Sequence, residues 1–264
     1  MSTPRVQAPS ADEIERRFRG AGVTTLRPLL RGGLHALQLA RSFSWHAANP
    51  EALENVQEPV LMVANHCSHV DTAAILSVLP RAMRNRTCVA AALDVFGPAD
   101  RSTARPTSVL KRECLQVIVA AGFHAFAFDR NGSSLRSIRT ANDMVQRGWN
   151  LLLYPEGTRS RDGSMAPFKS GVGVLARKTG AAVLPIHVHG GSQVLPIGRT
   201  LPQRGHIVIR FGTPMRPTDD ESTSAFVSRV QDAVGALAPH SERQTDPSEA
   251  QAARDRAMAA PARP

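Results

Sequence analysis

The chain has 264 residues, of which 42% are hydrophobic and 20% are charged, and its formal net charge is +10 at pH 7. This balance is typical of a globular protein with one sizeable core, and it excludes collagen-like and coiled-coil compositions. The three cysteines, Cys67, Cys88 and Cys114, are isolated and odd in number, which argues against a disulfide framework and indicates a reducing compartment.

Residues 1–22 mix acidic and basic side chains without an apolar core, so we expect a flexible lead-in rather than a signal peptide. A run of about 18 apolar residues, which a membrane-spanning helix would need, does not occur in the chain. We therefore expect a cytoplasmic protein.

Residues 23–57 contain leucines close to helical spacing with arginines on either side. Pro28 and the following glycine pair should restrict a continuous helix to about Leu34 onward. Between residues 16 and 50 there are six arginines and no acid. We predict an amphipathic segment that either lies on an anionic membrane, on the inner face of the cell membrane, or packs on its own domain.

Residues 58–238 alternate apolar strands with helices. The predicted strands are "PVLMVAN", "TCVAAAL", "HAFAFD", "NLLLYPEG", "AAVLPIHVHG" and "HIVIRFG". The predicted helices cover residues 71–79, about 107–121, 133–147, 170–179 and 219–237. This alternation predicts one α/β domain with a mostly parallel central sheet flanked by helices. Residues 239–264, rich in alanine, proline and charge, are expected to be a disordered tail.

The stretch "VANHCSHVD" places His66 just beyond the first strand of this domain, at the carboxyl edge where open α/β sheets bind ligands. Four residues separate His66 from Asp71. If Asp71 lies near a helix start, its carboxylate can fold back onto the imidazole, fix the ring tautomer and stabilise the imidazolium. The alternative is a helix cap by Asp71 beside a surface histidine.

A protein nucleophile to complete such a pair is not evident. The chain has no Gly-x-Ser-x-Gly elbow, and Cys67 adjoins His66, where neighbouring side chains usually point apart. The simplest interpretation is that the nucleophile is a hydroxyl of the substrate, which His66 deprotonates.

A metal site is a second interpretation of the same histidines. His66, His69 and Asp71, together with His187 and His189 of "PIHVHGG", are chemically suitable zinc ligands. Their spacing matches no established ligand motif, so a metal-dependent hydrolase is the less favoured alternative and no metal is assigned.

The segment "LLLYPEGTRS" ends an apolar strand in Glu156, Gly157, Thr158 and Arg159. An acid, a glycine and an arginine at the end of a buried strand serve binding better than packing. The glycine lets the backbone approach a ligand and could direct its N–H to an oxyanion, and the guanidinium fits phosphate.

Two further basic residues stand beside predicted turns. Lys169, one of only three lysines, precedes Gly171 in "PFKSG", and Arg130 leaves the strand of "FAFDR" just before a helix start. Arginine clusters could also bind nucleic acid, but aromatic residues make up only 5% of the chain and no recognised reading module is present, so no nucleic acid is expected.

Taken in order, these blocks resemble the glycerolipid acyltransferase family, the 1-acylglycerol-3-phosphate acyltransferases and their relatives. "NHCSHVD" resembles the family's first block, "FDR" the second, "YPEGTRS" with "FKSG" the third, and "VLPIHV" the fourth. The resemblance covers about residues 58–215. His124 and Ala127 in the second block, and the two histidines that end the fourth, depart from the family pattern.

The resemblance implies a general base, His66, oriented by Asp71, and transfer of a fatty acyl group without a covalent acyl-enzyme. The donor would be acyl-CoA or acyl carrier protein, with no cofactor, and the acceptor a lysophospholipid or glycerol phosphate. The residues implied in substrate binding are Asn65, Arg130, Glu156, Gly157, Thr158, Arg159, Lys169, Gly171 and Pro185. A basic binding module without catalysis is a third interpretation.

Overall fold

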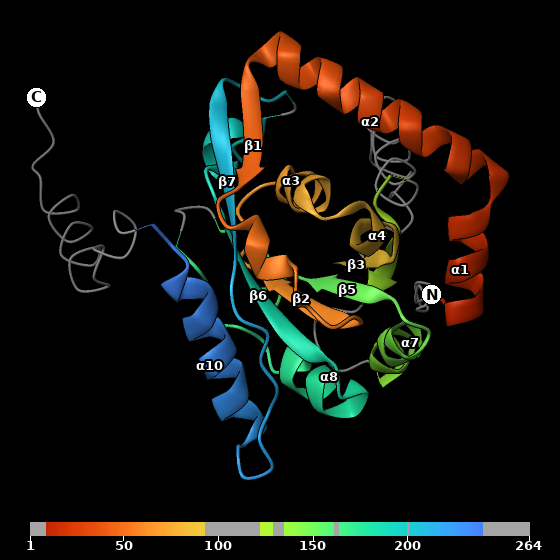
Figure 1. Ribbon diagram of the computed structural model, residues 1–264, viewed down its shortest axis with the longest axis vertical. Coiled ribbons are helices and arrows are strands. Elements are labelled where there is room, and N and C mark those ends of the chain that lie inside the picture. The colour runs from red at the N-terminus through yellow and green to blue at the C-terminus, as the bar shows by residue number, and fades with distance from the viewer. Residues whose placement is uncertain (1–8, 93–121, 129–134, 161–163, 200, 240–264) are drawn as a thin grey trace, which may run out of the picture.

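The computed structural model describes residues 9–92, 122–128, 135–160, 164–199 and 201–239. Its seven strands form one sheet in the order β1-β7-β6-β2-β5-β3-β4 (Figure 1). The strands are β1 (Phe43–Ala47), β2 (Val60–Ala64), β3 (Thr87–Ala92), β4 (Ala125–Phe128), β5 (Asn150–Leu153), β6 (Ala182–His189) and β7 (Gly205–Phe211). The run from β6 to β4 is parallel, whereas β7 pairs antiparallel with β6. The predicted mostly parallel α/β sheet is confirmed.

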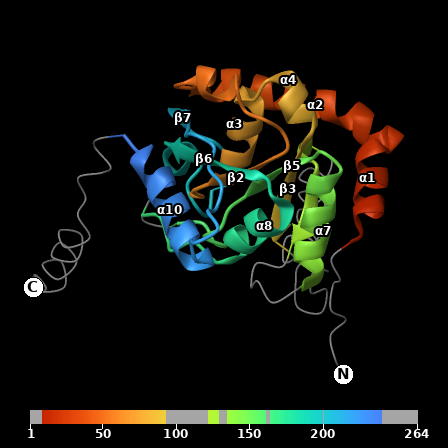
Figure 2. The ribbon, with the colours of Figure 1, turned by 60° about the horizontal axis from the view of Figure 1, so that its bottom comes forward.

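Helices cover both faces of this sheet (Figure 2). Side chains on alternate strand positions enter two separate cores. One core lies beneath α1, α7, α8 and α10, and the other beneath α3, α4 and α9. The helices are α1 (Ala11–Arg19), α2 (Ala21–Arg41), the 3-10 helix η1 (Pro50–Leu53), α3 (Asp71–Val78), α4 (Arg81–Asn85), α7 (Leu135–Gln146), α8 (Gly171–Thr179), α9 (Gly191–Val194) and α10 (Thr223–Ala236).

The expectation of a flexible lead-in is wrong for residues 11–19, which form α1. Ser10 caps this helix by accepting a hydrogen bond from the backbone N–H of Glu13 at 3.3 Å. Ile14 and Phe18 are 1% and 5% exposed, because they pack into the core beside α7. Burial of this apolar face makes the segment part of the domain.

Polar contacts also attach α1 to the domain. Arg147, just after α7, donates to Asp12 at 2.7 Å and to Glu15 at 3.3 Å. The indole N–H of Trp149 donates to Glu15 at 2.9 Å, and this bond together with the charge and hydrogen bonding of Arg147 holds the pKa of Glu15 below its usual range. The ring of Phe18 lies 5.3 Å from that of Trp149.

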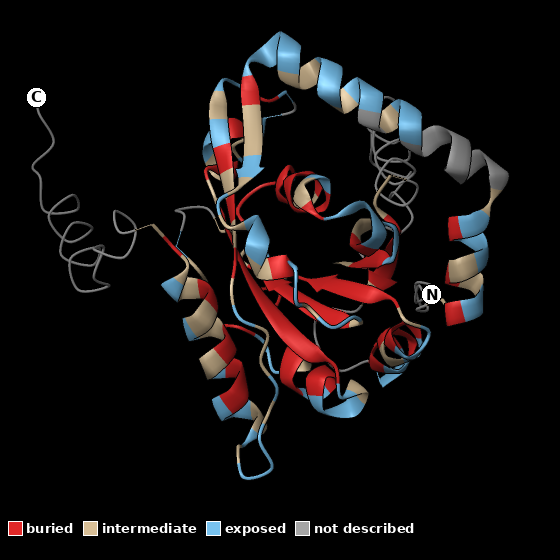
Figure 3. Ribbon diagram, viewed as in Figure 1, coloured by how far each residue is buried: buried red, intermediate tan, exposed pale blue. Residues whose placement is uncertain are grey.

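The helix predicted from about Leu34 is longer, because α2 runs continuously from Ala21 to Arg41 and includes Pro28. Helix propensity is a weak prior that tertiary context overrides, and α2 is anchored by α1 at one end and β1 at the other. Most of its described side chains are exposed (Figure 3). No helix among the described residues is both long and apolar enough to span a membrane.

Strand β1 is a second departure, because it falls inside the segment expected to be helical. Its five residues pair in parallel with β7, with Phe43 opposite Gly205 and Ala47 opposite Ile209. Phe43 is buried against the core beneath α3. The other six strands lie where the sequence predicts them; the helix predicted at about 107–121 lies outside the described residues.

Candidate active site

The histidine of the first block lies directly beyond β2, at the carboxyl edge of the parallel strands. Nδ1 of His66 is 3.0 Å from Oδ2 of Asp71, the first residue of α3. The His66 side chain is 19% exposed and that of Asp71 is fully buried. The contact predicted from the four-residue separation is therefore present. With Nδ1 donating to the carboxylate, Nε2 keeps the lone pair that a general base needs.

Backbone groups of the same loop hold the Asp71 carboxylate. Its Oδ2 accepts hydrogen bonds from the N–H groups of Cys67 at 2.9 Å and Ser68 at 2.7 Å. The hydroxyl of Ser68 donates to the carbonyl of Leu195 at 2.7 Å, which ties the loop to the segment after α9. Because one carboxylate binds both the loop backbone and the imidazole, the position of His66 depends on Asp71.

A glycine after β6 makes room for this carboxylate. A Cβ atom on Gly191 would stand 2.2 Å from Oδ1 of Asp71, far inside contact distance. The preceding Gly190 has a φ of 84°, which side chains rarely adopt. The two consecutive glycines directly follow the "PIHVH" strand, so this close approach has a visible signal in the sequence.

Glu156, expected at the acceptor site, holds two loops together in this structure. It is 4% exposed, and its two carboxylate oxygens accept the backbone N–H groups of His66 at 2.8 Å and Ala166 at 2.9 Å. Burial raises the pKa of Glu156, while these two hydrogen bonds lower it, and burial has the larger effect. Glu156 thus joins the loops after β2 and β5, which are neighbouring strands.

The side chain of Lys169 lies against Gly157, in the loop that follows β5. Gly157 has a φ of 75°, and a Cβ atom there would be 2.7 Å from Nζ of Lys169. The backbone N–H of Lys169 donates to the carbonyl of Pro155 at 3.0 Å, which fixes its position. The N–H of Gly157, suggested for an oxyanion, instead donates to the carbonyl of Tyr154 at 3.1 Å.

Arg159 approaches the first block from the same loop. It is half-buried, whereas Thr158 is exposed. Although His69 is exposed overall, partial desolvation of its ring lowers the pKa of His69, and the positive charge of Arg159 lowers it further. The backbone N–H of Ser160 donates to the carbonyl of His66 at 2.9 Å. Two basic side chains, Lys169 and Arg159, therefore belong to the loops that meet at His66.

Three of the implied binding residues serve the fold in this structure. The Asn65 amide pairs with the backbone of Val188, donating at 3.0 Å and accepting at 2.7 Å, and so continues the β2–β6 pairing beyond the last strand residue. Pro185 is buried within β6, where its carbonyl accepts the N–H of Gly212 at 2.8 Å, and Gly171 opens α8. Arg130 lies outside the described residues.

The metal interpretation finds no support in the arrangement of the histidines. Within the described parts of the chain, no three His, Cys, Asp or Glu side chains gather in a group that could hold a metal ion. His66 is instead bonded to Asp71, and His187 is buried in β6.

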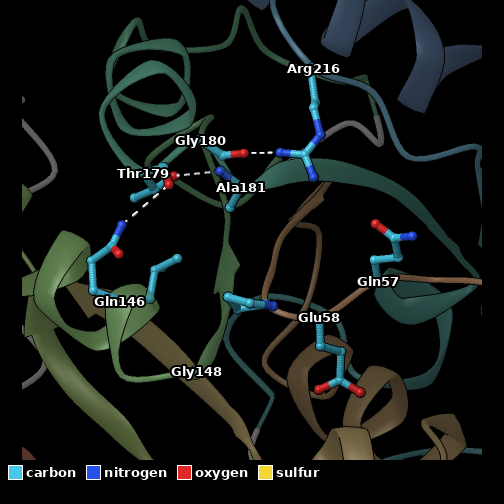
Figure 4. A pocket seen from close by; sticks show the side chains of 10 residues that line it. Gln57, Glu58, Gln146, Gly148, Thr179, Gly180, Ala181 and Arg216 are labelled. Carbon is cyan, nitrogen blue, oxygen red and sulfur yellow. Dashed lines mark hydrogen bonds between the residues drawn. The ribbon is translucent and has the colours of Figure 1, made fainter.

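A pocket of about 290 Å³ lies at the other edge of the sheet (Figure 4). Glu58 and Gly148 line it just before β2 and β5, at the amino ends of the strands. Thr179 and Gly180, at the end of α8, accept hydrogen bonds there from Gln146 and Arg216. The pocket therefore does not include the residues gathered around His66.

The carboxyl edge of the sheet thus presents a hydrogen-bonded His–Asp pair, and the neighbouring loops carry Arg159 and Lys169. Residues 47–189 match the acyltransferase family, and because this match includes more than half of the chain, the chain belongs to that family. The resemblance drawn from the four sequence blocks is thereby confirmed.

Individual relatives are all named 1-acyl-sn-glycerol-3-phosphate acyltransferases. A chloroplastic protein of Brassica napus is 38% identical over 66 residues, 25% of this chain and 19% of that protein. A Pseudomonas aeruginosa protein is 27% identical over 154 residues, 53% of this chain and 60% of that protein. A Cocos nucifera protein is 21% identical over 212 residues, 76% of this chain and 61% of that protein. The matched segments thus span less than two thirds of these relatives.

A solved structure has the same fold. The 1-acyl-sn-glycerophosphate acyltransferase of Thermotoga maritima superimposes with a TM-score of 0.56, covers 88% of each chain and is 20% identical in sequence.

Proposed function

We propose that this protein transfers a fatty acyl group from acyl-CoA or acyl carrier protein to a hydroxyl of a phosphorylated glycerolipid, with lysophosphatidic acid as the first acceptor to test. The observation that carries the proposal is the contact of 3.0 Å between Nδ1 of His66 and Oδ2 of Asp71. Arg159 and Lys169 belong to neighbouring loops. The family membership and the names of the relatives support the same reaction.

In the proposed mechanism the acceptor supplies the nucleophile. Nε2 of His66 takes the proton of the acceptor hydroxyl as its oxygen attacks the thioester carbonyl carbon. The carbon–sulfur bond then breaks, and the departing thiolate receives the proton back from the imidazolium. General-base assistance of this kind contributes about 10²–10⁴-fold to the rate. No cofactor takes part in this scheme.

Cys67 is a poor candidate for a covalent intermediate, although it adjoins the base. Burial raises the pKa of the Cys67 thiol, and the neighbouring charge of Asp71 raises it further. Its Sγ lies 3.7 Å from Oδ1 of Asp71 rather than beside the imidazole nitrogen. Because the thiolate is the reactive form, this environment disfavours an acyl-cysteine.

The acceptor phosphate would bind to Arg159 and Lys169, with Arg130 of the second block as a further contact. The guanidinium can hold two phosphate oxygens at once, and the ammonium adds a compact positive charge. A phosphate held there would place the hydroxyl of the same molecule near His66.

We further propose that α2 lies on an anionic membrane surface. Its sequence contains three arginines and no acid, and Leu29 and Leu39 are each 72% exposed. Apolar side chains with flanking arginines suit an interfacial helix. Salt-sensitive cosedimentation with vesicles containing anionic lipid would support this role, and equal sedimentation of the Leu29→Asp/Leu39→Asp double variant would contradict it.

The decisive experiment follows thiol release from palmitoyl-CoA with and without lysophosphatidic acid. Wild type should release thiol only with the acceptor present, and His66→Ala should lose this activity by at least about 10²-fold while its melting temperature stays close to that of wild type. His69→Ala, which removes a neighbouring exposed histidine not bonded to Asp71, is the matched control and should retain most activity. Acceptor-independent release, or full activity of His66→Ala, would contradict the proposal.

A further inference from the structure

The face of the His66 ring lies against a residue outside the His–Asp pair. The imidazole stacks on the phenol ring of Tyr154, with ring centroids 4.1 Å apart and planes inclined by 23°. The hydrogen bond from Nδ1 to Asp71 fixes one edge of the imidazole, but the ring can still tilt about that bond. Contact along the ring face removes this remaining freedom.

Tyr154, the only tyrosine of the chain, is itself held by α3. Its hydroxyl lies 2.8 Å from Oγ1 of Thr72, and both side chains are half-buried. Thr72 directly follows Asp71, so two consecutive residues of one helix act on the same imidazole. Asp71 hydrogen-bonds the edge of the His66 imidazole. Thr72 hydrogen-bonds Tyr154, whose phenol ring contacts the face of that imidazole.

The backbone of Tyr154 belongs to the loop that joins the two strand ends. Tyr154 comes directly after β5, whose last residue, Leu153, pairs with Val63 of β2. Its carbonyl accepts the N–H of Gly157 at 3.1 Å. Tyr154 is therefore held at two places: its backbone continues from β5, and its hydroxyl contacts Thr72 of α3.

We propose that Tyr154 and Thr72 are positioning residues that hold the His66 imidazole at the angle at which Nε2 meets the acceptor hydroxyl. This inference rests on the role of His66 as a general base proposed above. A general base must come within hydrogen-bond reach of the proton that it takes, and a misplacement of about 1 Å can lower the rate about 10²-fold. Tilting of an unsupported ring would produce such misplacement.

Four variants distinguish the contribution of the Tyr154 ring from that of its hydrogen bond to Thr72. They are Tyr154→Leu, Tyr154→Phe, Thr72→Val and the double variant Tyr154→Phe/Thr72→Val. We expect kcat to fall about 50-fold in Tyr154→Leu and about 5-fold in each single hydrogen-bond variant. The double variant should lose no more than either single one, because both substitutions remove the same bond. The KM values for donor and acceptor should change less than about 2-fold, since substrate contacts are retained.

Kinetic results of another form would overturn the inference. A raised KM at unchanged kcat would make Tyr154 a substrate contact, and multiplied losses in the double variant would show that the two hydroxyls act separately. Tyr154→Phe restores the ring without the hydroxyl, so its activity should recover about 10-fold over Tyr154→Leu; equal loss in both would exclude ring support.

Proton NMR tests the same contact without turnover. The ring protons of His66, assigned with His66→Ala, should be shifted upfield by the ring current of Tyr154. This shift should vanish in Tyr154→Leu and decrease in Thr72→Val. If wild type transfers no acyl group while the shifts behave in this way, the proposed function fails and the positioning of His66 is upheld. Unchanged shifts in both variants would overturn the inference whatever the activity.

Discussion

Buried polar side chains lie at both the amino and the carboxyl edge of the parallel sheet, and their hydrogen bonds serve different purposes at the two edges. At the amino edge, fully buried Asn150 accepts the N–H of Val60 at 2.9 Å and donates to Glu58 at 2.6 Å. At the carboxyl edge, Asp71 is equally buried, but it binds the loop that presents the partly exposed His66. Burial of a satisfied polar group is thus common to both edges. The carboxyl edge differs because its buried carboxylate contacts an imidazole that solvent can reach.

The largest effect on turnover is expected from Asp71→Asn. His66 Nδ1 and the N–H groups of Cys67 and Ser68 all contact Oδ2, so an amide of the same size can take two orientations. With its oxygen at that place it lacks the charge that stabilises the imidazolium, and with its NH2 group there it reverses the tautomer of His66. Either outcome should lower kcat, by about 10³–10⁴-fold where the tautomer is reversed. The reversed orientation also opposes the two N–H groups, which should lower the free energy of unfolding by about 1–3 kcal/mol. Steady-state kinetics and urea unfolding measure the two effects.

The matched control for that substitution is Asp143→Asn, which changes an exposed aspartate of α7 in the same way. It should alter neither kcat nor stability measurably. A kcat of Asp71→Asn within about tenfold of wild type would show that the carboxylate is not needed to orient the base.

An intermediate effect is expected from Glu156→Gln. Glutamine has one acceptor oxygen where the carboxylate uses two, so either the His66 loop or the Ala166 loop loses its hydrogen bond. We expect kcat to fall about 10–100-fold through displacement of His66, because an error of about 1 Å is costly there. Unchanged kcat would mean that the two loops hold their places without Glu156.

The same residue predicts a dependence of stability on pH. Because the folded state raises the pKa of Glu156 above its usual value of 4.5, the folded protein binds this proton more tightly than the unfolded chain. The stability that Glu156 contributes should therefore be complete below that usual value and decline as pH rises through the raised pKa. Urea unfolding of wild type and Glu156→Gln across this range should show the advantage of wild type shrinking; a growing advantage would contradict the prediction.

The smallest effect on turnover is expected at the amino edge. Asn150→Ala leaves the buried N–H of Val60 without its side-chain acceptor and should lower the free energy of unfolding by about 3 kcal/mol. At a temperature where the variant is folded, its kcat should stay within about twofold of wild type. Gln57→Ala, at an exposed position of the same edge, should change neither quantity. A specific loss of kcat in Asn150→Ala would erase the difference between the edges.

The contact between His66 and Asp71 and most of the sheet could be predicted because their signals are local. The apolar run of β2 ends two residues before His66. The four residues between His66 and Asp71 are enough for a turn that leads to the start of α3. Strand β1 could not be predicted in the same way, because Trp45 becomes part of a strand only by pairing with Ile207, far away in the chain. The strand is thus defined by a long-range partner rather than by its own pattern.

Other features escaped prediction for two different reasons. Ser10 followed by Glu13 is a sequence signal for the start of α1. The many charged residues around them favoured a disordered segment instead. Glu156 could be recognised as important from its place after β5, yet its binding of backbone N–H groups depends on how two loops meet. The stacking of Tyr154 on His66 likewise arises from neighbouring strand ends.

The attachment of α2 at both ends has a geometric consequence. The helix is joined at one end to α1, which packs on α7, and at the other end to β1, the edge strand of the sheet (Figure 1). A helix attached to its domain at one end only could change its orientation relative to the domain. Because α2 is attached at both ends, its orientation relative to the sheet is fixed. Any flat surface that α2 rests on therefore fixes the tilt of the whole sheet relative to that surface, and with it the direction in which the loop of His66 faces.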